Sequence, residues 1–102
     1  MSGISTHVLD VSAGRPASGI MVQLFFGGEL AGSGITDGNG RIQTLLANPK
    51  PGNYCLLFDS GSYYPDGFYP EVRIFFIVRD SSAHYHVPLL LSPFGYTTYR
   101  GS

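Results

Sequence analysis

The residues best suited to chemistry in this chain are its three histidines. His84 and His86 form a His-x-His pair late in the sequence, whereas His7 lies near its start. An imidazole has an ordinary pKa of about 6.5, so it can take up or release a proton at neutral pH. Its neutral nitrogen can also bind zinc. The pattern therefore allows acid–base catalysis or metal binding, although an isolated His-x-His is more often a surface or hydrogen-bonded pair.

The other motifs do not fit a calcium loop, a serine or cysteine nucleophile, or a metal site at the histidine pair. The segment Asp37–Arg41 begins like a calcium loop but lacks a third ligand and the closing glutamate, so its Asn-Gly pair predicts a tight hairpin instead. The chain has no Gly-x-Ser-x-Gly motif, and Cys55 lies within an apolar stretch, so a serine or cysteine nucleophile is not supported. No acidic or cysteine ligand stands near the histidine pair at a suitable spacing, so we predict no metal site.

The composition predicts one domain over residues 1–102. The net charge of -1 gives no reason to expect a nucleic acid or an anionic membrane as a partner. No apolar run approaches the ~20 residues of a membrane span, and no secretion signal is recognisable at the start, so we predict a cytoplasmic protein. Only 13% of the residues are charged, against roughly 25–35% on a well-solvated small surface, which indicates a surface partly covered by another subunit.

Short strands must position these side chains. Turn-forming residues divide the chain into roughly eight strands without a helical period, which favours an all-β sandwich or barrel. The predicted strands span residues 4–11, 20–26, 29–36, 41–46, 53–59 and 71–79, followed by two strands within residues 84–102. The segment 60–70 is predicted to be an irregular link with room for one helical turn.

The alternation of side chains predicts which histidines leave the core. In the strand that starts at His84, four apolar residues share the face that must be buried: Tyr85, Val87, Leu89 and Leu91. His84, His86 and Pro88 lie on the opposite face, and Pro88 has no N–H, so we predict an edge strand or a distortion there. His7 likewise lies opposite core-like Val8.

Several segments, taken together and in order, resemble the 5-hydroxyisourate hydrolases, the transthyretin-related protein family. The similar segments are Ser5–Asp10 with Gly14–Ala17, Thr36–Arg41, Phe68–Val72, His84–Pro93 and Tyr99–Ser102. They cover nearly the whole chain, while the loops around Gly27 and between Asp59 and Pro70 look short for the family.

The resemblance implies a transthyretin-like (prealbumin-like) sandwich of two antiparallel or mixed sheets, with about eight strands and at most one short helix. It implies a homotetramer, a dimer of dimers, with active sites in a channel between facing subunits. The implied activity is hydrolysis of 5-hydroxyisourate to 2-oxo-4-hydroxy-4-carboxy-5-ureidoimidazoline, in the degradation of urate towards allantoin, without a cofactor.

The resemblance also implies roles for individual residues. The catalytic set is His7, Arg41 and His86, and the substrate-binding set is Tyr99, Arg100, Gly101 and Ser102. The two catalytic histidines would activate water and transfer protons, with the choice of general base left open, and Arg41 would hold carbonyl oxygens or an anionic ring. Ser102 would orient water or substrate through its hydroxyl or carboxylate, and His84 would be a strand-end or supporting residue.

Three alternatives to a cofactor-free hydrolase stay open on the sequence. One is a non-enzymatic transthyretin-like carrier of a small ligand, which would be expected to lack the histidine and arginine set and the Tyr-Arg-Gly-Ser tail. Another is a zinc hydrolase that uses His7, His84 and His86, which retained activity after chelation would remove. The third is a β-sandwich that serves only as an interaction module.

Deletion of residues 99–102 is expected to reduce activity more than stability, because this tail is predicted to serve the site rather than the core. Turnover of 5-hydroxyisourate and thermal unfolding, measured on the same preparation, check this expectation. A variant that loses stability and activity in parallel would contradict it.

Overall fold

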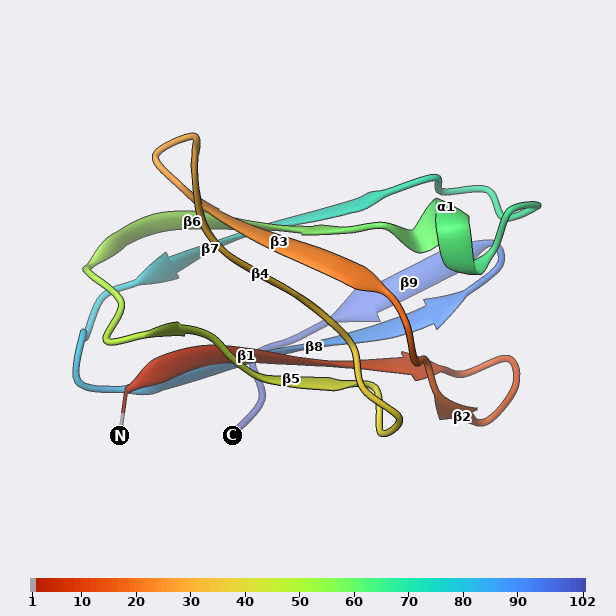
Figure 1. Ribbon diagram of the computed structural model, residues 1–102, viewed down its shortest axis with the longest axis horizontal. Coiled ribbons are helices and arrows are strands. Elements are labelled where there is room, and N and C mark those ends of the chain that lie inside the picture. Colours follow the sequence, from red (N-terminus) through yellow and green to blue (C-terminus); the bar gives the residue numbers. More distant parts are fainter. Residues whose placement is uncertain (1) are drawn as a thin grey trace.

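The computed structural model describes residues 2–102, which form two β-sheets that face each other (Figure 1). The five-stranded sheet contains β1 (Gly3–Asp10), β2 (Arg15–Pro16), β5 (Arg41–Ala47), β8 (His84–Ser92) and β9 (Gly95–Thr98). The four-stranded sheet contains β3 (Met21–Phe26), β4 (Glu29–Ile35), β6 (Gly52–Phe58) and β7 (Val72–Val78). The predicted strands are therefore confirmed, and β2 is a two-residue addition within a predicted turn.

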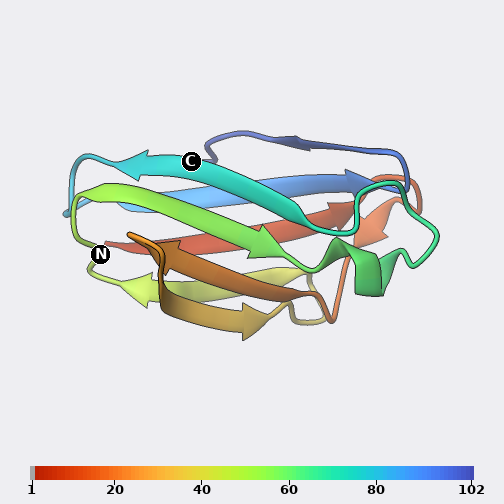
Figure 2. The same ribbon diagram turned by 90° about the horizontal axis from the view of Figure 1, so that it is seen from above.

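The two sheets differ in their strand directions. All neighbours in the four-stranded sheet, ordered β4-β3-β6-β7, are antiparallel. In the other sheet β1 runs parallel to β8, and its remaining pairs, including β5 on β1, are antiparallel. Figure 2 shows β4 beside β5 at one edge of the sandwich, whereas β7 and β9 lie at the opposite edge. The sandwich of antiparallel or mixed sheets implied by the resemblance is thus confirmed, with one sheet antiparallel and the other mixed.

The core between the sheets is formed by alternate residues of each strand, because successive side chains of a strand point to opposite faces. The four residues of β8 predicted to face inward are all buried: Tyr85, Val87, Leu89 and Leu91. They pack with buried residues of the facing sheet that include Val22, Leu24, Leu56 and Phe58. The opposite face of β8 is consequently free to carry His84 and His86.

Pro88 does not make β8 an edge strand, because β8 lies between β1 and β9. The distortion falls on the neighbouring segment instead. Paired residues of β8 and β9 end at Leu89 and Thr98, and a single bridge between His86 and Gly101 follows beyond the gap. Pro88 has no N–H to donate across this gap, and its carbonyl accepts a hydrogen bond from Thr98 Oγ1 at 2.7 Å.

The link after β6 contains one short helix, α1 (Ser60–Tyr63), as its length allowed. Asp59 caps this helix by accepting hydrogen bonds from the backbone N–H and the hydroxyl of Ser62. Within residues 2–102 we find no helix whose length and apolar character would let it cross a membrane.

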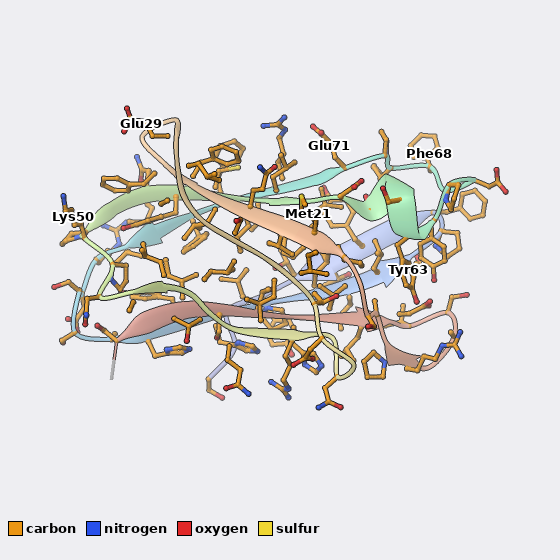
Figure 3. The ribbon with its side chains drawn as sticks, in the orientation of Figure 1. Met21, Glu29, Lys50, Tyr63, Phe68 and Glu71 are labelled. Carbon is orange, nitrogen blue, oxygen red and sulfur yellow. The ribbon has the colours of Figure 1, made fainter. Side chains whose placement is uncertain are left out.

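Tyr63 connects α1 to the five-stranded sheet (Figure 3). Its hydroxyl donates a 2.7 Å hydrogen bond to Oδ2 of Asp10, the last residue of β1. Burial raises the pKa of Asp10, but hydrogen bonds from the Tyr64 and Tyr63 hydroxyls and from backbone N–H groups outweigh it and leave the pKa below its ordinary value. The carboxylate therefore ties the helix to the far sheet mainly in its ionised form.

The substitution Tyr63→Phe is expected to lower the free energy of unfolding at pH 7 by about 1.5–3 kcal/mol, because it removes a hydrogen bond to a charged group. A carboxyl with a lowered pKa stabilises the fold above its unfolded pKa, and this contribution disappears as pH falls through the folded value. The difference between variant and wild type should therefore shrink in acid. Urea unfolding at pH 7 and near pH 3 measures it, with Tyr96→Phe as the control for loss of an exposed phenol. Equal losses for both variants at pH 7 would contradict the expectation.

Candidate active site

A polar pocket of about 520 Å³ lies on the outer face of the five-stranded sheet. This volume falls within the roughly 300–1,000 Å³ typical of small-molecule sites. The residues that line it come from β1, β5, β8 and the C-terminal segment: Ser5, Thr6, Arg41, Ile42, Gln43, His84, His86 and Ser102. Three of the predicted site residues, Arg41, His86 and Ser102, therefore meet here.

The parallel pairing of β1 with β8 places Ser5 directly beside His86. The Ser5 Oγ atom lies 2.7 Å from His86 Nδ1 and 2.8 Å from His84 Nε2. One buried hydroxyl thus joins both histidines of the His-x-His pair. The strands are fixed here by the neighbouring Thr6, whose Oγ1 donates a 2.6 Å hydrogen bond to the carbonyl of Val87.

His86 is held in its neutral form by its surroundings. Burial lowers the pKa of its imidazole, and electrostatic interaction with nearby Arg41 and with the rings of His7 and His84 lowers it further. Because Nδ1 is engaged by Ser5, the nitrogen left for chemistry is Nε2. A neutral imidazole with one available nitrogen can accept a proton at neutral pH.

The tight turn before β5 positions Arg41 and also fixes His7. Asp37 Oδ1 accepts hydrogen bonds from the backbone N–H groups of Asn39 and Arg41, both at 2.9 Å. The prediction of a hairpin was wrong, because this turn leads from β4 in one sheet to β5 in the other, and the two strands are not paired. His7 Nε2 lies 2.9 Å from the carbonyl oxygen of Asn39, and since a carbonyl only accepts, this nitrogen carries the hydrogen. His7 is paired with Arg41 across β1 and β5 but stands outside the residues that line the pocket.

The C-terminal segment crosses to the outer side of the five-stranded sheet after β9 (Figure 1). Gly101 donates its N–H to the carbonyl of His86 at 2.8 Å, which brings Ser102 into the pocket. A Cβ atom at position 101 would stand 2.6 Å from Cδ2 of His86 and 3.3 Å from Cγ of Pro88. The absence of a side chain at Gly101 is what allows this close approach.

Tyr99 and Arg100 lie apart from the histidine pocket within one chain. Both border a groove between β7 and the C-terminal segment, where the Arg100 guanidinium carbon stands 4.5 Å from the ring centre of buried Tyr85. Tyr99 is 55% exposed. Their predicted contact with substrate stays a prediction.

Sequence reasoning missed four of the residues that line the pocket: Ser5, Thr6, Ile42 and Gln43. The signal for Ser5 was its position two residues before His7, on the same strand face, and Gln43 stands in the same relation to Arg41. Neither signal was decisive, because Ser5 meets His86 on the partner strand β8, and these two residues are 81 positions apart in the sequence.

The geometry gives little support for a metal-binding cluster or for a cysteine nucleophile. Across residues 2–102, no three His, Cys, Asp or Glu side chains gather closely enough to hold a metal ion together. Cys55 lies on the other sheet, where burial raises the pKa of its thiol. A thiol with a raised pKa is a poor nucleophile at neutral pH.

Two facing sheets in this strand order define a transthyretin-like β-sandwich, and the polar pocket gives that sandwich an outer-face site. The model of the HIUase/Transthyretin family matches residues 4–101. The chain therefore belongs to the HIUase/Transthyretin family.

Individual relatives fall into two groups. A probable 5-hydroxyisourate hydrolase of Caenorhabditis elegans is 44% identical over 111 positions, covering 99% of this chain and 82% of its own. The structure of Klebsiella pneumoniae 5-hydroxyisourate hydrolase has a TM-score of 0.92 and 38% identity, with 100% of both chains covered. Sea bream transthyretin, solved in complex with thyroxine, has a TM-score of 0.86 and 27% identity over 96% of this chain and 93% of its own. The first alignment is longer than this chain, which agrees with loops that are short for the family.

The substitution Gly101→Ala is expected to detach the C-terminal segment from β8, because its new methyl group would overlap the His86 ring. Amide hydrogen exchange at position 101 should become faster, and the ring resonances of His86 should shift. Gly95→Ala is the matched control, since a Cβ atom there meets only Ser92 Oγ at 3.8 Å. Unchanged exchange at position 101 would contradict the packing described here.

Proposed function

We propose that this protein hydrolyses 5-hydroxyisourate to 2-oxo-4-hydroxy-4-carboxy-5-ureidoimidazoline, a step in the degradation of urate towards allantoin. The observation that carries the proposal is the pocket in which neutral His86 faces Arg41. Relatives named as 5-hydroxyisourate hydrolases, at 41–44% identity and over 97–100% of this chain, support the same reaction. The residue roles that follow belong to this proposal.

His86 is the general base of the proposed reaction. Its lowered pKa keeps it unprotonated at neutral pH, and its free Nε2 can take a proton from water. The water oxygen then forms a bond to the ring carbonyl carbon, and the carbonyl oxygen takes up the negative charge. Arg41 stabilises this oxyanion with its planar set of N–H donors. Cleavage of the C–N bond completes the step when the leaving nitrogen receives the proton.

The other carried-over residues bind and orient the substrate. His7 presents Nδ1 to its surroundings, because Nε2–H is engaged by Asn39, so it serves as a second proton-transfer group near Arg41. Gly101 and Ser102 form the wall beside His86, and Ser102 orients water or substrate. Tyr99 and Arg100 act on substrate in a site shared between subunits.

The proposed assembly is a homotetramer, a dimer of dimers. Large apolar side chains on the edge strand β7 and beyond β9 support it, with Phe75 76% exposed and Tyr99 55% exposed. Burial of such residues against another copy would remove apolar surface from water. We further propose a single functional domain over residues 1–102 and a cytoplasmic location.

A non-enzymatic carrier is the alternative, because sea bream transthyretin shares the fold and was solved with thyroxine. It is less well supported than the hydrolase, since His86 and Arg41 have no evident role in a carrier. Freshly generated 5-hydroxyisourate distinguishes the two: its ultraviolet absorbance should decay faster with the protein than without it. Decay at the spontaneous rate would overturn the proposed activity.

His86→Ala and Arg41→Ala are each expected to lower the turnover rate by at least ~100-fold, because each residue acts in the transition state. Initial rates of 5-hydroxyisourate decay at matched protein concentration measure the effect.

Arg79→Ala is the control for loss of an arginine outside the pocket, and its rate should stay near that of wild type. Thermal unfolding of each variant separates loss of chemistry from loss of fold. Near-normal turnover by folded His86→Ala would exclude His86 as the base.

A further inference from the structure

The hydroxyl of Ser5 can satisfy His84 and His86 only in an ordered way. A serine hydroxyl has one hydrogen to donate and can accept from another group. Its oxygen lies within 2.8 Å of one nitrogen on each ring, so it donates to one histidine and accepts from the other. When both imidazoles are neutral, the direction of this one O–H bond therefore sets the tautomer of both.

We propose that Ser5 is a positioning residue that links His84 to His86 in a His–Ser–His chain and holds His86 with its hydrogen on Nδ1. This inference rests on the proposed function, in which His86 Nε2 accepts a proton. His84, whose role the sequence left open, becomes the outer end of the chain.

The direction of the chain follows from the charge beside the pocket. Arg41 lies near His86, and a cation favours a lone pair over an N–H group on the nitrogen that faces the same pocket. His86 Nε2 is then the unprotonated nitrogen, and Nδ1–H donates to Ser5 Oγ. Ser5 in turn donates its hydrogen to His84 Nε2.

The same chain gives a proton a way out of the pocket. The first proton that Nε2 takes from the attacking water goes on to the leaving nitrogen. When Nε2 then takes the second proton from the newly formed carboxyl group, His86 carries hydrogens on both nitrogens. Its Nδ1 hydrogen passes to Ser5 Oγ as the Ser5 hydrogen passes to His84 Nε2. His84 then bears the positive charge, and it can release its Nδ1 hydrogen to solvent. Atoms and charge balance at each step, and no bond to carbon changes.

The location of the three groups favours this direction of transfer. His86 is partly buried beside Arg41 and is a poor place for a positive charge, whereas His84 is exposed to water. Ser5 is only 6% exposed and is fixed by the continuous register of β1 with β8. Its oxygen therefore stays between the rings.

The tautomer of His86 is the direct test. Long-range ¹H–¹⁵N spectra of the wild type above pH 7.5 should report hydrogen on Nδ1 and none on Nε2. In His84→Ala the Ser5 hydroxyl loses its acceptor and can donate to His86 Nδ1 instead. Arg41 alone then favours hydrogen on Nδ1, so part of the His86 population should move its hydrogen to Nε2. This variant alters an exposed side chain and is expected to fold. If the nitrogen chemical shifts of His86 are the same in His84→Ala as in the wild type, the proposed His–Ser–His chain is wrong.

Activity supplies the second test. Ser5→Ala should lower kcat/KM by roughly 10- to 100-fold, the range found when a partner that orients a functional histidine is removed. Ser5→Thr keeps a hydroxyl and should recover part of this loss. Ser92→Ala is the matched control, because it removes a part-buried hydroxyl of the same sheet whose single hydrogen bond goes to Gly95. A folded Ser5→Ala with the rate of Ser92→Ala would overturn the positioning role.

The two proposals fail in different ways. A wild-type protein without turnover would refute the hydrolase, while the spectra would still show whether Ser5 fixes His86. If the wild type is active but the nitrogen chemical shifts of His86 stay the same in His84→Ala and Ser5→Ala, only the His–Ser–His chain is refuted.

Discussion

The parallel pairing of β1 with β8 is the interaction on which the fold and the site both depend. Eight consecutive residues of each strand are in register, from Gly3 beside His84 to Asp10 beside Leu91. On the inner face this register packs Ile4 and Val8 into the core with Tyr85 and Leu89. On the outer face the same register sets Ser5 against His86. A shift by one residue would exchange the faces and destroy the core and the pocket together.

The other site residues are added to this pair by local backbone interactions. Asp37 closes the turn that positions Arg41, and the Asn39 carbonyl of that turn is hydrogen-bonded to the His7 ring. On the opposite side, Gly101 attaches the C-terminal segment to the carbonyl of His86. Each attachment uses backbone groups rather than a side-chain contact with the substrate. The pocket is therefore preorganised by its scaffold, which leaves the functional side chains free for chemistry.

Much of the architecture could be predicted from the sequence, because strand alternation and turn residues are local signals. The inward face of β8 and the helical turn after β6 were predicted correctly. The Asn39-Gly40 turn was also recognised, but it connects the two sheets instead of closing the predicted hairpin, because the pairing partners of β4 and β5 are other strands. The effect of Pro88 was predicted only in part, since its missing N–H disrupts the pairing of the next segment without making β8 an edge strand. The role of Ser5 could not be predicted, because it arises from a register between strands at opposite ends of the chain. The resemblance supplied His7, Arg41 and His86, but nothing in the sequence placed Arg100 against Tyr85.

The separation of β1 and β8 also governs the order of events during synthesis. β1 leaves the ribosome before its partner β8, which follows about 80 residues later. Until then β1 can form backbone pairs only with β2 and β5, which have two and seven residues. Such distant contacts close late and slowly, because a long loop must lose its freedom first. The nascent chain can thus complete neither its five-stranded sheet nor its polar pocket until β8 and the segment after it have been translated.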